Sequence, residues 1–198
     1  AADVMAAMDC DGDAVMKDLL DQQAGNPSKR LFIKHMAHHL VGLDLGFLEH
    51  TCNVFLIRDP REMLPSLVIQ VPKAQLADTG LRRQWELYAG LCESGQQPAI
   101  LDSRELLVDP EGVLRRLCDY LGHAFTPTML EWPPGPRPED GVWAPHWYHA
   151  VHKSKGFAPY RPKTEFPERL EPLLAECQPW YDRLFERAIR ASVYGDTE

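Results

Sequence analysis

The sequence has no long hydrophobic run and no excess of positive charge. A membrane-spanning helix needs about 18 or more consecutive apolar residues, and no such run occurs in the 198 residues. Residues 1–13 also lack the basic region with which a signal peptide begins. The formal net charge of -8 does not attract nucleic acid or an anionic membrane. We therefore expect a cytoplasmic protein with neither as partner, in which any anion-binding site is local.

Cysteine pairs and complete metal-ligand motifs are also missing. The five cysteines are an odd number without a C-x-x-C pair, and most stand beside apolar residues, as small buried side chains do. His146, His149 and His152 have a helical spacing that can place three imidazoles on roughly one side of a helix. No acidic or cysteine companion stands at ligand spacing, so we expect that they do not share a metal.

Short apolar runs indicate buried strands. Leu31–Ile33, Asn53–Ile57 and Ala99–Leu101 are continuous and apolar, as strands covered on both faces are. Helical patterns lie between and after them, at residues 3–23, 60–70, 80–94, 110–121 and about 168–191. This alternation predicts an α/β fold with three layers, a mainly parallel sheet with helices on both faces.

The length and composition favour one domain over residues 1–198. The chain is 44% hydrophobic, enough for one sizeable core at this length but not for two. Residues 127–167 are rich in Pro, Gly, Trp and Tyr and have no clean periodicity, which indicates an irregular but ordered covering segment. In the last helical pattern, Pro172 and Pro179 are expected to break or kink the helix.

The most specific local feature is the strand and turn at residues 54–61, followed by a helix that contains Ser66. A buried strand that ends in Arg58 and enters a helix places a guanidinium and free N–H groups at the carboxyl edge of the sheet, where α/β folds bind phosphorylated ligands. Ser66, eight residues later, can add a hydroxyl donor. The alternative is a surface turn in which Arg58 pairs with Asp59 or Glu62.

The stretch LIRDPREMLPSL resembles the 3′-phosphate-binding segment of sulfotransferases. FIKHMAHHL, LRRLCDYLGHAF and GPRPEDGVWAPHWYHAVHKSKGF are similar to a soluble bacterial and plant branch of that family. The resemblance implies a P-loop-type α/β fold and 3′-phosphoadenosine 5′-phosphosulfate as co-substrate. Arg58 and Ser66 would hold its 3′-phosphate, and the sulfuryl group would pass to a hydroxyl or amine of a small-molecule acceptor.

One part of the family pattern is missing. Family members carry a loop with Arg, Ser, Gly and Thr that cradles the 5′-phosphosulfate, whereas Asp11, Gly12 and Asp13 here are acidic and would repel it. We expect the loop, with its strand, on a missing amino-terminal piece, since losing a central strand exposes its neighbours' edges. The alternative is a non-catalytic nucleotide-binding or interaction module. A P-loop phosphotransferase is disfavoured because G-x-x-x-x-G-K-[ST] is absent.

Three residues after the first predicted strand are candidates for catalysis. Sulfuryl transfer needs a base for the acceptor's proton and a cation for the charge on the leaving nucleotide. In the family a histidine on an equivalent strand is usually the base, so His35 is the first choice and His38 the second, because imidazole titrates near neutrality. Lys34 would supply the charge. The alternative is that all three are polar residues at a strand end.

A later segment, Lys153 to Gly156, resembles more loosely the basic and glycine segment that closes over the 3′-phosphate. Lys153, Lys155 and Gly156 would form a mobile clamp, and solvated surface lysines are the alternative. Three tryptophans could stack on the adenine or line the acceptor pocket, with core packing as the alternative: Trp132, Trp143 and Trp147.

Overall fold

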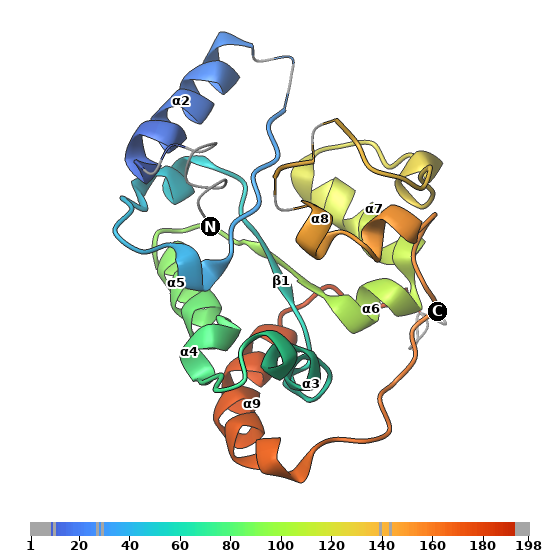
Figure 1. Cartoon of the computed structure of the whole chain (residues 1–198). Helices are drawn as coiled ribbons and strands as arrows, with labels where there is room; N and C mark the ends of the chain where they lie inside the picture. The colour runs from blue at the N-terminus through green and yellow to red at the C-terminus, as the bar shows by residue number, and fades with distance from the viewer. Residues whose placement is uncertain are drawn as a thin grey trace, which may run out of the picture.

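The computed structural model describes residues 9, 11–26, 28, 30–138, 140–142 and 144–192, without the side chains of His146 and Trp147. Helices surround a small parallel sheet in a mixed α/β arrangement (Figure 1). The α-helices and strands are α2 (Gly12–Gly25), β1 (Val54–Ile57), α3 (Pro60–Gln70), α4 (Leu76–Thr79), α5 (Leu81–Glu93), β2 (Ala99–Asp102), α6 (Ser103–Val108), α7 (Pro110–Leu121), α8 (Ala144–Trp147) and α9 (Glu171–Phe185). Short 3₁₀ turns lie at Ala37–His39, Gly46–His50, Pro127–Met129, Val151–Lys153 and Glu168–Leu170.

The sheet pairs β1 with β2 in parallel. Val54 lies opposite Ala99, and the two strands stay in register to their last residues. All four residues of β2 are buried. On the other side of β2, the Ile189 backbone N–H donates to the Ile100 carbonyl at 2.8 Å, so β2 has a neighbour on each side. The predicted parallel strands at residues 53–57 and 99–101 are confirmed.

The predicted strand at Leu31–Ile33 is wrong. These residues pair with no strand that the structure describes, and Phe32 is 90% exposed. The Leu31 N–H donates instead to the side-chain oxygen of Gln23, at 2.8 Å. An apolar run becomes a strand only where a neighbouring strand offers backbone hydrogen-bond partners. In β1, the backbone carbonyl of Leu56 is already bonded, because it accepts from the side chain of Gln84 in α5 at 2.9 Å. In the described residues the sheet is therefore smaller than the sequence predicts.

The core lies where both strands meet α3, α5 and α9. Each of these elements contributes a side chain that is at most 1% exposed, and burying an aliphatic side chain of this size contributes about 1.5 to 3 kcal/mol. The buried cluster consists of Ile57, Leu64, Val68, Leu81, Ile100, Leu170, Leu174, Cys177, Tyr181, Leu184 and Ala188. α9, near the end of the described chain, thus packs beside α3 and α5 (Figure 1).

The helices that follow an aspartate and a proline begin where the sequence predicts. The Asp59 side chain accepts from the Arg61 N–H at the start of α3, and Asp109 accepts from the Gly112 N–H in α7. Proline follows each aspartate, at a position where the helix needs no backbone donor. α7 ends at Leu121 and is followed by Gly122, whose φ of 63° lies in the left-handed region. α3 and α7 therefore have the predicted bounds.

Other helices differ from the prediction. α9 runs without interruption from Glu171 to Phe185 although Pro179 lies inside it. Pro172 stands in the first turn, where no donor is required, and Pro179 is exposed, so the carbonyl that it leaves unbonded can face water. In the first predicted helix, α2 covers residues 12–25, and residues 3–8 lie outside the described part.

The segment at residues 127–167 has little regular structure, as expected. Its described residues hold α8 and two 3₁₀ turns, and Glu131 forms an antiparallel bridge with Gly156. A side chain at Gly156 would meet the Leu130 carbonyl oxygen at 2.8 Å, so this crossing requires glycine. Over the described ranges, no helix has the length and apolarity to cross a membrane.

Candidate functional site

The end of β1 and the start of α3 place Arg58 as the sequence predicts. Ile57 is 1% exposed, whereas Arg58, the next residue, is exposed at the carboxyl end of the strand. Asp59 caps α3, which turns the chain away from the sheet directly after the arginine. The Arg58 Nε atom lies 3.9 Å from a carboxylate oxygen of Glu62, so the pairing of the surface-turn alternative is also present.

Ser66 shares a helical face with Glu62 and is joined there by Lys163. The Lys163 ammonium donates to the Ser66 hydroxyl oxygen at 3.1 Å and to the Glu62 backbone carbonyl at 2.8 Å. These contacts link residues about a hundred positions apart. Among the residues that the structure describes, Lys163 forms no ion pair with a carboxylate. Its charge is therefore available to an anion at Ser66.

Tyr160 and Phe166 fasten the segment of Lys163 to α3. The Tyr160 hydroxyl donates to the Glu62 carboxylate, and the Arg104 guanidinium lies over the Tyr160 ring, 5.8 Å from its centre. Burial, together with the charge and hydrogen bond of Glu62, raises the pKa of Tyr160 to about 12. The Arg61 guanidinium lies over Phe166 at 4.8 Å. We call residues 157–167 the α3 strap.

Arg58, Ser66 and Lys163 of the α3 strap are exposed and are linked through Glu62 along one face of α3. Arg58 supplies a planar fork, Ser66 a hydroxyl and Lys163 an ammonium, and the carboxylate of Glu62 is the negative charge among them. A phosphate monoester matches such donors, because it carries up to two charges and three acceptor oxygens. Sequence reasoning missed Lys163 and Tyr160, since nothing local in an irregular segment signals a contact with α3.

Lys153, Lys155 and Gly156 are tied to another part of the covering segment. The Trp132 N–H donates to the Lys155 carbonyl at 3.1 Å, and the Trp132 indole donates to the Ser154 hydroxyl at 2.8 Å. Both lysine side chains are exposed. The described contacts join Lys163, and neither of these lysines, to Ser66; their clamp role stays a prediction.

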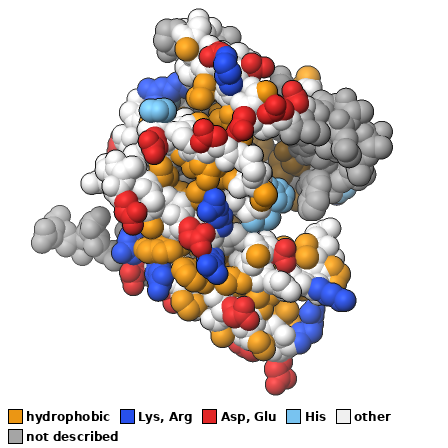
Figure 2. All heavy atoms as spheres, turned by 90° about the vertical axis from the view of Figure 1, so that its left-hand side faces the viewer, with side chains coloured by type: hydrophobic (Ala, Val, Ile, Leu, Met, Phe, Trp, Pro, Cys, Tyr) orange, Lys and Arg blue, Asp and Glu red, His pale blue; other side chains and the backbone are white. Residues whose placement is uncertain are grey.

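Of the candidate catalytic residues, His38 lies beside α4 and α5. The prediction that the candidates follow a strand which ends at the same sheet edge as Arg58 is wrong, because residues 31–33 form no strand. The His35 ring packs against Phe47 with centres 5.7 Å apart, and Lys34 is exposed. His38 lies in a 3₁₀ turn that contacts α4 and α5. Figure 2 shows histidine side chains gathered near the middle of the face that carries these helices.

The pKa values of both candidate bases are lowered, which favours the neutral form of their imidazoles. Burial lowers the pKa of His35 below its ordinary value. Burial and the neighbouring His39 lower the pKa of His38, while Asp78 acts in the opposite direction. A neutral imidazole can accept a proton, which is what a general base must do. No described hydrogen bond or ion pair connects either histidine with Arg58 or Ser66, and the catalytic roles of His35, His38 and Lys34 stay predictions.

The later histidines show a pair rather than a cluster. His152 Nε2 lies 2.8 Å from a carboxylate oxygen of Asp140. Hydrogen bonds from the backbone N–H of Arg137 and, to a smaller extent, from His152 lower the pKa of Asp140. Within the described side chains, no three histidine, cysteine or acidic groups come together to hold a metal. His146 and Trp147 have no described side chain and Trp143 lies outside the described residues. Trp132 packs edge-on against Phe157.

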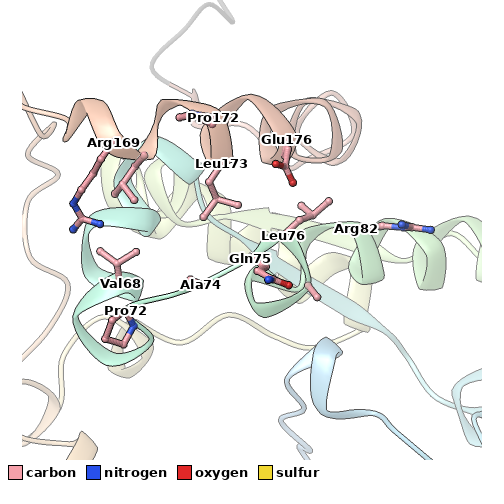
Figure 3. A pocket seen from close by; sticks show the side chains of 12 residues that line it. Val68, Pro72, Ala74, Gln75, Leu76, Arg82, Arg169, Pro172, Leu173 and Glu176 are labelled. Carbon is pink, nitrogen blue, oxygen red and sulfur yellow. The ribbon is translucent and has the colours of Figure 1, made fainter.

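A cavity of about 590 Å³ lies between α3, α4 and α9. Figure 3 shows Val68, Leu76 and Leu173 around it, with Arg169 and Arg82 on opposite sides. A cavity of this size fits a small molecule. Arg58, Ser66 and Lys163 are not among the residues that line it, so it is distinct from the site at the start of α3.

Two curated relatives from Arabidopsis thaliana are similar to most of the chain. Branched-chain-amino-acid aminotransferase-like protein 2 is 39% identical over 92% of this chain and 32% of its own length. Branched-chain-amino-acid aminotransferase-like protein 1 is 40% identical over 92% of this chain and 33% of its own length. The chain thus spans about a third of either relative, and no solved structure matches it.

The model of the family described as "Sulfotransferase domain" matches residues 3–188. The chain therefore belongs to the sulfotransferase-domain family.

Proposed function

We propose that the chain is the 3′-phosphate-binding part of a sulfotransferase with a P-loop-type fold. Its donor is 3′-phosphoadenosine 5′-phosphosulfate, and its acceptor is a small molecule with a hydroxyl or amine. The observation that carries the proposal is the linkage of Arg58, Ser66 and Lys163 through Glu62 on one face of α3: Arg58 lies beside the Glu62 carboxylate, and Lys163 donates to the Glu62 backbone carbonyl and to Ser66. Membership of the sulfotransferase-domain family supports the reaction class.

The proposed reaction is a direct in-line transfer without a metal. The acceptor oxygen or nitrogen attacks sulfur, the bond between sulfur and the bridging phosphate oxygen breaks, and 3′,5′-diphosphoadenosine leaves. The acceptor's proton passes to a base, for which His35 and His38 are the candidates, and Lys34 would offset charge on the leaving oxygen. Arg58, Ser66 and Lys163 bind the far end of the nucleotide and hold it during transfer.

A second function, a nucleotide-binding module without catalysis, is favoured by the start of α2. The Asp11 side chain accepts from the Ala14 N–H at 3.0 Å and caps the helix. An acidic helix cap repels a phosphosulfate, so residues 11–13 do not serve as the donor loop. This module would use the same 3′-phosphate site, and the two functions differ only in whether sulfuryl transfer takes place.

Nucleotide preference tests the site common to both functions. We expect 3′,5′-diphosphoadenosine to bind this chain roughly ten- to a hundred-fold more tightly than adenosine 5′-monophosphate, since a charged hydrogen-bonding group is worth about 1.5 to 3 kcal/mol. Isothermal titration calorimetry measures both affinities. Adenosine 5′-diphosphate is the control, because it carries two phosphates at one end and should bind like the monophosphate. Equal affinity for all three nucleotides would contradict the proposal.

A further inference from the structure

Glu62 is the only carboxylate in direct contact with Arg58 among the described residues. Its side chain is 13% exposed, against 46% for Arg58, and the two groups are 3.9 Å apart. The other Glu62 oxygen accepts from the Tyr160 hydroxyl. The carboxylate thus stands between a cation that a phosphate would use and a neutral donor from the α3 strap.

Tyr160 is suited to hold this carboxylate at any physiological pH. Burial and Glu62 raise its pKa to about 12, so the hydroxyl keeps its proton and remains a donor. The ring is half-buried beneath Arg104, which fixes the direction of the hydroxyl. Lys163, on the same strap, bonds the backbone carbonyl of Glu62 rather than its carboxylate. The strap therefore restrains the Glu62 side chain without neutralising it by a salt bridge.

We propose that Glu62 is a specificity-determining residue of this site, an internal anion that occupies Arg58 until a phosphate displaces it, with Tyr160 retaining the displaced carboxylate. This inference rests on the proposed function. A phosphate monoester brings between one and a half and two negative charges at neutral pH, more than the single charge of Glu62. It gains from the exchange, whereas a group with one negative charge replaces Glu62 at little advantage.

The exchange sets a modest cost on nucleotide binding. A partly exposed ion pair such as Arg58–Glu62 is worth up to about a fivefold factor in an equilibrium constant. Glu62→Gln keeps an acceptor for Tyr160 and removes the competing charge. This variant should bind 3′,5′-diphosphoadenosine about two- to fivefold more tightly than the wild type. Tyr160→Phe releases the charged carboxylate toward Arg58, and should weaken binding by a similar factor.

Calorimetry on the full chain, with 3′,5′-diphosphoadenosine and adenosine 5′-monophosphate as probes, tests the inference. The Tyr160→Phe effect should largely disappear in Glu62→Gln, and Glu62→Gln should no longer change the ratio of the two affinities once Arg58 is alanine. A merely structural role would not give this dependence. Glu111→Gln is the matched control, because Glu111 pairs with Arg115 in the same i,i+4 manner on α7, and it should change neither affinity.

The outcomes separate this inference from the proposed function. Unchanged or weaker binding by Glu62→Gln, in a protein that still prefers the diphosphate, overturns the role of Glu62 alone. A wild-type chain without that preference overturns both. If Glu62→Gln does not fold, Tyr160→Phe decides: weaker binding with an intact melting temperature supports the inference, and unchanged binding overturns it.

Discussion

Replacing Arg58 by alanine should remove most of the preference for 3′,5′-diphosphoadenosine over adenosine 5′-monophosphate. The Arg58 guanidinium can make two parallel charged hydrogen bonds to one phosphate, and losing them costs about 1.5 to 3 kcal/mol, or roughly ten- to a hundred-fold in affinity. Only the diphosphate loses this affinity, so the two nucleotides should become nearly equal in calorimetry. Arg58 is 46% exposed, and the fold should survive its removal.

Two further variants give the Arg58→Ala result its meaning. Ser66→Ala removes one neutral hydroxyl and should reduce the preference less, by about two- to tenfold. Arg115→Ala removes an exposed arginine that pairs with Glu111 on α7 and lies over Phe125, and should leave the preference unchanged. A preference that persists in Arg58→Ala would leave the surface-turn interpretation standing.

Tyr181→Phe should destabilise the protein by about 1.5 to 3 kcal/mol at neutral pH. Tyr181 is 4% exposed and its hydroxyl donates to a carboxylate oxygen of Asp102, which is fully buried, at 3.1 Å. The other Asp102 oxygen accepts from the N–H groups of Arg104 and Glu105 at the start of α6. Removing the hydroxyl leaves a buried charge with one donor fewer. Urea unfolding measures the loss.

The pH dependence identifies the cause of that loss. Burial raises the pKa of Asp102 above its unfolded value, so its ionisation costs stability as the pH rises from the unfolded pKa through the folded pKa. Without the Tyr181 hydroxyl the folded pKa rises further. The difference between variant and wild type should therefore grow toward neutral pH and shrink toward acid pH, where Asp102 is protonated in both.

The control is Tyr120→Phe. The Tyr120 hydroxyl donates to the backbone carbonyl of Asn53 at 3.2 Å, and the side chain is 40% exposed. Losing this neutral, partly hydrated bond should cost less than 1.5 kcal/mol, without the same pH dependence. A Tyr181→Phe loss that is equal at acid and neutral pH would indicate that the hydroxyl acts through packing and not through Asp102.

Local patterns in the sequence predicted the elements whose causes are local. The Asp–Pro starts of α3 and α7 lie in consecutive residues, and the apolar runs of β1 and β2 are continuous, although only β2 is buried throughout. Leu31–Ile33 shows the same apolar character without forming a strand, because strand formation also depends on a partner that the run itself does not specify. Pro179 is tolerated in α9 because it faces solvent. Which face of a helix is exposed depends on how the helix packs in the fold, and the local sequence around the proline does not specify this.

The site divides in the same way. Arg58 and Ser66 could be predicted from the end of a strand and from a helical spacing. Lys163 and Tyr160 could not, because they contact Ser66 and Glu62 from almost a hundred positions later in the sequence. The contact depends on how the α3 strap crosses α3, for which an irregular segment gives no periodic signal. The sequence indicates Glu62 as a possible partner of Arg58, but the hydrogen bond of Glu62 with Tyr160 appears only in three dimensions.

The central claim, that a 3′-phosphate binds at Arg58, is tested most directly by phosphorus NMR of 3′,5′-diphosphoadenosine titrated with the chain. The 3′ and 5′ phosphates of the ligand give separate signals. We predict that the 3′ signal shifts or broadens with wild-type protein and that Arg58→Ala abolishes this change. A change confined to the 5′ signal, or a 3′ change that is undiminished in Arg58→Ala, would contradict the account.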